Sequence, residues 1–148
     1  GVLGIKDVEK FVDPGITLKL QSVDLKAQLD SNHPEQKNLD SFYLIEFSEG
    51  EGERNISLNV IDMTSDTLAS LWYGRVQQEI PNSIEVTSLG DAALKRQANK
   101  DEQLGNIVLV QRNDIVFQLH TFEPNDDDEP IVSLSDLVEI ARIVEKNI

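Results

Sequence analysis

Two neighbouring segments, 106–111 and 115–122, constrain the fold more than any other part of the chain. They read NIVLVQ and IVFQLHTF, and β-branched and aromatic residues of this kind are typical of strands. The polar residues 112–114 between them suit a tight hairpin tip. In the second segment one set of alternate positions is apolar and the other set is mixed, which predicts a sheet with one side on a core. We therefore expect an antiparallel meander over 83–122.

Further strands are predicted over 16–21, 41–48 and 56–63, where apolar and polar residues alternate. The last two of these should form a hairpin. The polar segment 30–40 contains a proline and is predicted to be a loop.

Three amphipathic helices are predicted over 5–12, 66–80 and 134–146. Ser133 and Asp136 match a capping box at the start of the last helix. The expected packing stripe of the middle helix consists of Leu68, Leu71, Trp72, Val76 and Ile80. Hairpins with helices packed on one face indicate an α+β fold, and the 148 residues form a single domain over 1–148.

The net charge of −14 argues against binding to nucleic-acid phosphates or to anionic membranes, both of which need clustered Lys and Arg. The absence of cysteine excludes disulfides, thiol catalysis and thiolate metal sites. No apolar run approaches the ~20 residues that span a bilayer, so no membrane insertion is expected.

A ligand-binding groove is predicted between the helix at 66–80 and the mixed face of the sheet. Its candidate residues are Tyr43, Trp72, Tyr73, Gln118 and His120. Neither His120 nor His33, the other histidine, has the spacing or the Cys and His neighbours of a metal site.

The densest carboxylate run is the candidate metal site, with calcium as the ion that such oxygen ligands favour. It comprises Asp126, Asp127, Asp128 and Glu129. The EF-hand pattern is absent, so a solvated loop is favoured over a calcium site, and no other cofactor is predicted.

No phosphate-cradling loop and no G-x-S-x-G nucleophile elbow is present. The catalytic alternative is a small hydrolase that uses His120 with an acid such as Asp62 or Asp91.

The run 87–93 (TSLGDAA), followed after a polar turn by 107–116 (IVLVQRNDIV), resembles bacterial exported lipoproteins and sensor-type domains. In those proteins a GLGDEA segment precedes a strand pair of the form hhhRxGxhhh. Ala92 replaces the acidic residue, and Asn113 replaces the glycine of the hairpin tip. The final helix is similar to their LxxLAxxV ending, through Leu137, Ile140, Ala141 and Val144.

This resemblance covers about a third of the chain. It implies a PsbP-like α/β/α sandwich, which some members adopt, and an extracytoplasmic accessory or ligand-binding role without catalytic residues. We expect a non-catalytic exported domain, periplasmic or on the cell surface, that binds a partner protein or a small ligand. A lipid anchor upstream is compatible with the resemblance, and a cytoplasmic location is the alternative. The alternatives are the His120 hydrolase and a calcium-stabilised interaction module.

Overall fold

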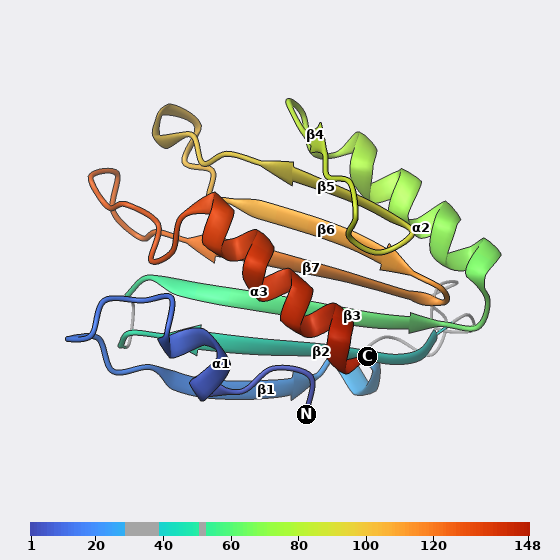
Figure 1. The fold of residues 1–148 in the computed structure, drawn as a ribbon, viewed down its shortest axis with the longest axis horizontal. Helices are drawn as coiled ribbons and strands as arrows, with labels where there is room; N and C mark the ends of the chain where they lie inside the picture. The colour runs from blue at the N-terminus through green and yellow to red at the C-terminus, as the bar shows by residue number, and fades with distance from the viewer. Residues whose placement is uncertain (29–38, 51–52) are drawn as a thin grey trace.

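The computed structural model describes residues 1–28, 39–50 and 53–148. The predicted loop over 30–40, with His33, lies almost entirely outside the described residues. A seven-stranded antiparallel sheet forms the centre of the described structure, and three α-helices pack on it (Figure 1). The predicted α+β class with an antiparallel sheet is confirmed.

The sheet consists of two meanders that meet at its centre. In chain order the strands are β1 (Lys19–Asp24), β2 (Leu39–Ser48), β3 (Asn55–Met63), β4 (Ile84–Glu85), β5 (Ala92–Arg96), β6 (Ile107–Arg112) and β7 (Ile115–Phe122). Their spatial order is β1-β2-β3-β7-β6-β5-β4, and each neighbouring pair is antiparallel. The strand predicted over 16–21 is thus observed a few residues later, as β1.

The predicted hairpin of β6 and β7 is confirmed, with a tip shorter than expected. Arg112 pairs with Ile115, so only Asn113 and Asp114 form the turn. Asn113 has φ of +54°, a left-handed conformation that asparagine tolerates better than most residues.

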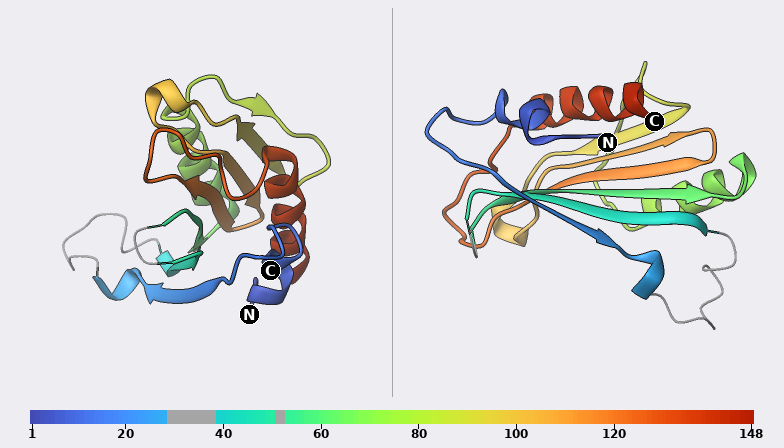
Figure 2. Two further views of the ribbon diagram at one scale, coloured as in Figure 1. Left: turned by 90° about the vertical axis from the view of Figure 1, so that its left-hand side faces the viewer. Right: turned by 90° about the horizontal axis from the view of Figure 1, so that it is seen from below.

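The three helices are α1 (Ile5–Glu9), α2 (Asp66–Gln78) and α3 (Leu134–Asn147). We call the sheet side of Phe117 and Leu119 face A, and the side of Val116, Gln118 and His120 face B. Helices α1 and α3 lie side by side on face A (Figure 2). Helix α2 packs on face B.

The prediction that all helices share one face is therefore wrong. The reason lies in the central strands, which carry apolar side chains on both sides. Five consecutive residues of β6 are buried, from Ile107 to Gln111. Strands of this kind need a covering layer on each face.

The main core lies between face A and the helices α1 and α3. Its members include Val8, Phe47, Ile56, Leu58, Phe117, Leu119, Leu137, Ile140, Ala141 and Val144. The predicted N-cap of α3 is present, since the Ser133 hydroxyl accepts a hydrogen bond from the Asp136 amide at 3.1 Å.

The packing stripe of α2 agrees with the prediction at Leu68, Trp72, Val76 and Ile80, which pack in the cluster on face B, and differs from it at Leu71. Ala69 and Tyr73 are its buried residues, whereas Leu71 is 67% exposed. The buried side chain of Gln111 donates a hydrogen bond from Nε2 to Ser70 Oγ at 2.9 Å. This contact turns the Ser70 side of the helix toward β6 and leaves Leu71 on the outside.

The segment before β5 forms a tight turn at Gly90, which has φ of +58°. A Cβ atom at this position would lie 2.5 Å from the carbonyl oxygen of Gln111. The Asp91 carboxylate accepts a hydrogen bond from the Asn113 amide at 2.7 Å, and Leu89 is buried in the core. The Leu-Gly-Asp residues thus dock this turn onto the β6–β7 hairpin.

Candidate functional site

Helix α2 covers only one half of face B, where it packs on Ile61, Leu109 and Val116. On the other half, the strand register places a largely polar row of side chains across the sheet. The row runs Gln21, Glu46, Ser57, His120, Ile107 and Arg96, each paired with the next on the adjacent strand. Directly opposed residues point to the same side of a sheet. These side chains therefore point to face B. Gln21, Glu46, Ser57 and His120 lie on the half that no helix of the described residues covers, which we call the uncovered half, whereas Ile107 and Arg96 are buried.

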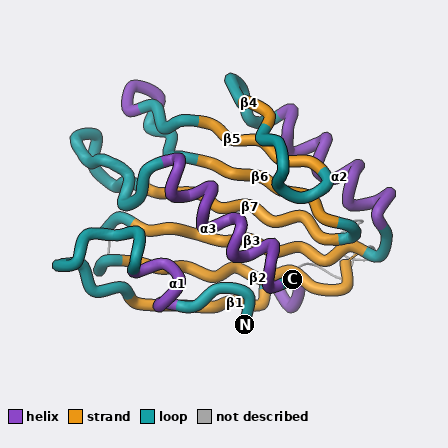
Figure 3. Tube along the Cα trace, in the orientation of Figure 1, coloured by secondary structure: helices purple, strands orange, loops and turns teal. Residues whose placement is uncertain are grey.

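A pocket of about 380 Å³ lies at one end of this row, and we call it the Arg96 pocket. Its walls are the β5–β6 loop (97–105) and the loop that follows β7 (123–130). Both loops lie at the same end of the sheet (Figure 3). Arg96, Leu104, Ile107, His120, Phe122 and Glu123 line it, together with loop residues. Its volume falls in the lower part of the range for small-molecule sites, roughly 300–1,000 Å³.

A second, wider hollow of about 700 Å³ lies beside it over strands β1, β2 and β3. Lys19, Gln21, Glu46 and Asn55 are among its lining residues. Phe122 lines both hollows and is 52% exposed. Because the exposed ring of Phe122 borders both, the Arg96 pocket and the wider hollow are neighbouring parts of one surface.

Asn106 holds both walls of the Arg96 pocket. This residue is 1% exposed, and its Oδ1 accepts a hydrogen bond from the Ala98 amide at 2.7 Å. Its Nδ2 donates to the carbonyl oxygen of Val132 at 3.2 Å. Its own amide donates to Thr121 Oγ1 at 2.9 Å. One buried side chain thus ties the loop before β6 to the loop after β7.

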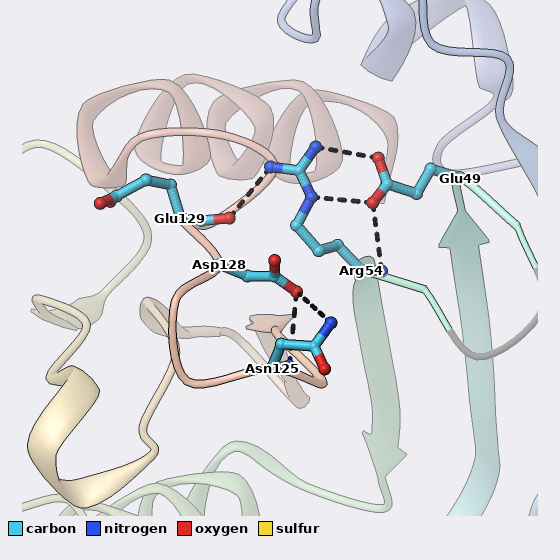
Figure 4. A network of polar contacts seen from close by, with 5 residues as sticks. All are labelled: Glu49, Arg54, Asn125, Asp128 and Glu129. Atoms are coloured by element: carbon cyan, nitrogen blue, oxygen red, sulfur yellow. Dashed lines mark hydrogen bonds and ion pairs between the residues drawn. The ribbon is translucent and has the colours of Figure 1, made fainter.

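Polar contacts across the rim of the Arg96 pocket also join the 97–105 loop to the 123–130 loop. Lys100 forms an ion pair with Glu129, and Gln103 donates a hydrogen bond to Asp126 at 3.2 Å. Arg54, at the start of β3, donates from Nη1 to the carbonyl oxygen of Glu129 at 3.0 Å (Figure 4). The pocket walls are therefore fixed to each other and to the β2–β3 hairpin.

Arg96 is the least solvated charge of the site, with 7% of its surface exposed. Its Nη2 donates to the carbonyl oxygen of Gly105 at 3.1 Å, while its Nε has no partner among the described residues. Gly105 is required there, because a Cβ atom would lie 1.8 Å from the carbonyl oxygen of Thr121. Burial lowers the pKa of Arg96, and the charge of Glu102 opposes that effect.

Two further titratable groups line the Arg96 pocket. Burial, with a smaller contribution from the charge of Arg96, lowers the pKa of His120. Burial raises the pKa of Glu123, while a hydrogen bond with Thr121 and the charge of Arg54 oppose that effect. Its Oε2 is buried and has no hydrogen-bond partner in the described part of the chain. The residues around the pocket thus include a guanidinium, a histidine whose pKa is lowered and a glutamate whose pKa is raised.

The structure brings together only part of the predicted ligand site. Gln118 and His120 both point to face B, and His120 lines the Arg96 pocket. Tyr43 pairs with Val60 and so points to face A. Tyr73 is buried between α2 and the sheet, where burial raises its pKa to about 12, and Trp72 is half-buried against the same cluster.

The two acids predicted to assist His120 lie elsewhere. Asp62 pairs with Ile115, at the opposite end of β7. Five residues of strand separate that position from His120, which is roughly 17 Å. Asp91 hydrogen-bonds the β6–β7 turn at that same far end.

The predicted metal ligands are not gathered around one point. Asp126 accepts a hydrogen bond from Gln103, Asp128 from the amide of Asn125, and Glu129 is paired with Lys100. The charge of Asp127, the fourth predicted ligand, acts on the same Lys100 as the charges of Asp128 and Glu129. Among the described residues, one group of three carboxylates does meet, namely Asp40, Asp62 and Asp114. Burial raises the pKa of Asp62, and the charges of Asp114 and Asp40 add to the effect.

Sequence reasoning missed Arg96, Asn106 and Glu123. A signal for Arg96 was present, because Ala92, Leu94 and Arg96 alternate along β5 and share one face. A charged residue on the same strand face as buried apolar residues indicates that its charge is itself buried. Asn106 and Glu123 had no comparable signal, since contacts distant in sequence create their surroundings.

None of the helices in the described part of the chain has the length and apolar character needed to cross a membrane. No protein-family model matches this chain, and no curated protein is significantly similar to it.

Proposed function

We propose that this protein is a non-catalytic binding domain that holds a small polar ligand on the uncovered half of face B. The observation that carries this proposal is the polar row across the central strands β3 and β7, directly beside the Arg96 pocket. The same strands carry apolar residues wherever a helix covers them. Ligand sites combine an apolar wall with a few polar groups that fix orientation, and the row and pocket supply both.

The site is also held in shape before any ligand arrives. Asn106 fixes both loops, and the Lys100–Glu129 pair closes the rim between them. A preformed site binds more tightly, because less conformational freedom is lost on binding.

The hydrogen bonding around His120 favours binding over hydrolysis. The Ser57 hydroxyl donates to the backbone carbonyl oxygen of His120, at 3.4 Å, and not to its ring. A nucleophile activated by a histidine needs a hydrogen bond to the ring nitrogen.

The extracytoplasmic setting rests on the resemblance of 87–93 and 107–116 to exported domains. Cell fractionation of the full-length protein tests it, and recovery in the cytoplasmic fraction would contradict it.

The binding proposal is tested by recording amide NMR spectra of the ¹⁵N-labelled protein against mixtures of small polar metabolites. We expect a ligand to shift amides of β3, β7 and the 97–105 loop together. Replacement of the exposed ring, Phe122→Ala, should weaken that binding. Leu71→Ala is the matched control, because Leu71 is likewise exposed but lies on the outer side of α2. Shifts confined to face A, or no shift with any mixture, would contradict the proposal.

A further inference from the structure

We infer that Asp40, Asp62 and Asp114 form a pH-dependent clasp, which a shared proton from the solvent closes in acid and which charge repulsion loosens at neutral pH. This aspartate clasp joins the start of β2, the end of β3 and the β6–β7 turn. It lies at the opposite end of β7 from His120, so the inference goes beyond the proposed binding function and does not depend on it.

Asp62 and Asp114 meet where the end of β3 contacts the β6–β7 turn. Asp62 pairs with Ile115, the first residue of β7. Asp114 directly precedes Ile115, and its carbonyl oxygen accepts a hydrogen bond from the Met63 amide at 2.7 Å. The backbone therefore holds the two aspartates as neighbours.

Asp40 reaches the same point from β2 through an irregular position in the sheet. The register of β2 with β3 shifts between Leu39 and Ser41, so Asp40 is an extra residue there. A bulge of this kind redirects a side chain. As a result, one carboxylate oxygen of each of the three aspartates lies within 4.8 Å of the other two.

The ionised clasp contains only hydrogen-bond acceptors. The Oδ1 atom of Asp62 is buried and has no hydrogen-bond partner among the described residues. A buried oxygen of this kind costs free energy unless a donor reaches it. A proton on one carboxyl group supplies that donor, because a protonated carboxyl group can donate to a neighbouring carboxylate. One proton therefore relieves both the repulsion and the unpaired oxygen.

The charges that act on Asp62 favour uptake of this proton. Burial raises the pKa of Asp62, and the negative charges of Asp114 and Asp40 add to the effect. Lys26 is a cation in contact with the clasp, but its Nζ donates to the backbone carbonyl oxygen of Asp40, at 3.4 Å. That contact leaves the three carboxylates without a compensating charge.

Two other charged residues near the turn are engaged outside the clasp. Arg112 points to the same face of the sheet as Asp62, but its Nη1 donates to the carbonyl oxygen of Glu145 at 3.0 Å. The Asp91 carboxylate accepts a hydrogen bond from the Asn113 amide. Neither residue supplies a donor to the buried oxygen of Asp62.

The direction of the pH effect follows from the raised pKa of Asp62. Such a group stabilises the fold below its ordinary pKa, 3.8 for aspartate, and this contribution is lost as the pH rises through the raised value. The clasp is therefore closed in acid. His120 and Glu123 also have shifted pKa values, so the experiment compares variants at each pH and not one protein across the pH range.

The first measurement follows the side-chain carboxyl carbon of Asp62 by NMR as the pH is lowered. We expect it to titrate above 3.8 in the wild type and closer to 3.8 in Asp114→Asn, which removes a negative charge and adds an amide donor. Asp136→Asn, in the first turn of α3, is the matched control and should leave the titration unchanged. A wild-type Asp62 that titrates at or below 3.8 would overturn the inference.

The second measurement tests whether the proton closes the clasp. The Met63 amide bonds the carbonyl oxygen of Asp114, so its protection from hydrogen exchange reports that contact. After correction for intrinsic exchange, we expect protection at least about threefold greater in mildly acidic buffer than at neutral pH. The Val86 amide, which bonds Ala93 in another turn, should show no such gain. In Asp62→Asn the gain at Met63 should disappear.

An equal gain at Met63 in the wild type and in Asp62→Asn would overturn the inference, and so would an equal gain at Val86. Calcium chloride that raises the protection of Met63 at neutral pH would show that the aspartates hold a metal ion and not a proton, which also overturns it. The wild-type titration needs no variant, so it decides the matter even if Asp62→Asn does not fold.

Discussion

The guanidinium of Arg54 donates two parallel hydrogen bonds to the carboxylate of Glu49, Nε to Oε1 at 2.8 Å and Nη2 to Oε2 at 2.9 Å. These hydrogen bonds lower the pKa of Glu49 and raise that of Arg54. The third nitrogen, Nη1, reaches the carbonyl oxygen of Glu129. The pair therefore joins the β2–β3 hairpin to one wall of the Arg96 pocket.

Replacing Arg54 by Gln should lower the free energy of unfolding by about 1–3 kcal/mol, because it removes charge-assisted hydrogen bonds from a poorly exposed carboxylate. Urea denaturation measures the change. Arg142→Gln is the control: its ion pair with Glu139 is exposed on both sides, so we expect a change of no more than about 1 kcal/mol. Equal effects of the two substitutions would show that the Arg54 pair contributes no more than a surface contact.

Gly90→Ala should destabilise the protein by about 1–3 kcal/mol, because alanine at a positive φ is strained and its Cβ meets the carbonyl oxygen of Gln111. Gly74→Ala, in the middle of α2, should instead stabilise it by roughly 0.5–1 kcal/mol, since no atom would crowd the new methyl group. Thermal unfolding compares the two variants. A tolerated Gly90→Ala would contradict the described turn.

Stability should fall as the pH decreases below about 6.5, the ordinary pKa of histidine. The pKa of His120 is lowered in the fold, so the unfolded chain takes up the proton at a higher pH than the folded one. Protonation therefore favours unfolding through this window, and the loss ends once the pH is below the lowered value.

His120→Gln should reduce this dependence, as measured by urea denaturation between neutral and mildly acidic pH. An NMR titration of the His120 ring checks the cause directly. A ring that titrates above the ordinary value would contradict the prediction.

The packing of α2 predicts opposite outcomes for two of its residues. Tyr73→Ala should cost about 3–5 kcal/mol, because a buried aromatic ring leaves a cavity. Leu71→Ala should change stability by less than about 0.5 kcal/mol, since the side chain is exposed. The reverse order would indicate that α2 turns its Leu71 side toward the sheet.

Much of the fold was predictable from local patterns. The alternation along 115–122 indicated a strand with a mainly apolar side, and Phe117 and Leu119 on that side are completely buried. The cap at Ser133 and the turn at Asn113 followed from the chemistry of single residues. The strand pattern also showed that face B was mixed, and the candidate site lies there.

The layer arrangement was harder to predict, because it depends on which face of the sheet each helix covers. Leu71 and Tyr73 are two residues apart and both hydrophobic, and only Tyr73 falls at helical spacing with Ala69, Val76 and Ile80. The hydrogen bond between Ser70 and Gln111, which are 41 positions apart, is formed in the orientation that turns Tyr73 to the sheet, and this partner on β6 could not be read from the sequence of α2.

The amino-acid sequence alone was sufficient for the antiparallel class, the helix starts and the hairpin turn, because each depends on residues that are neighbours along the chain. The Arg96 pocket was decided by the tertiary structure. Arg96, Asn106 and Glu123 come from three separate segments, and their burial and hydrogen bonding exist only once β5, β6 and β7 lie side by side. The environment of a charged side chain is a property of the assembled layers, and no local pattern encodes it.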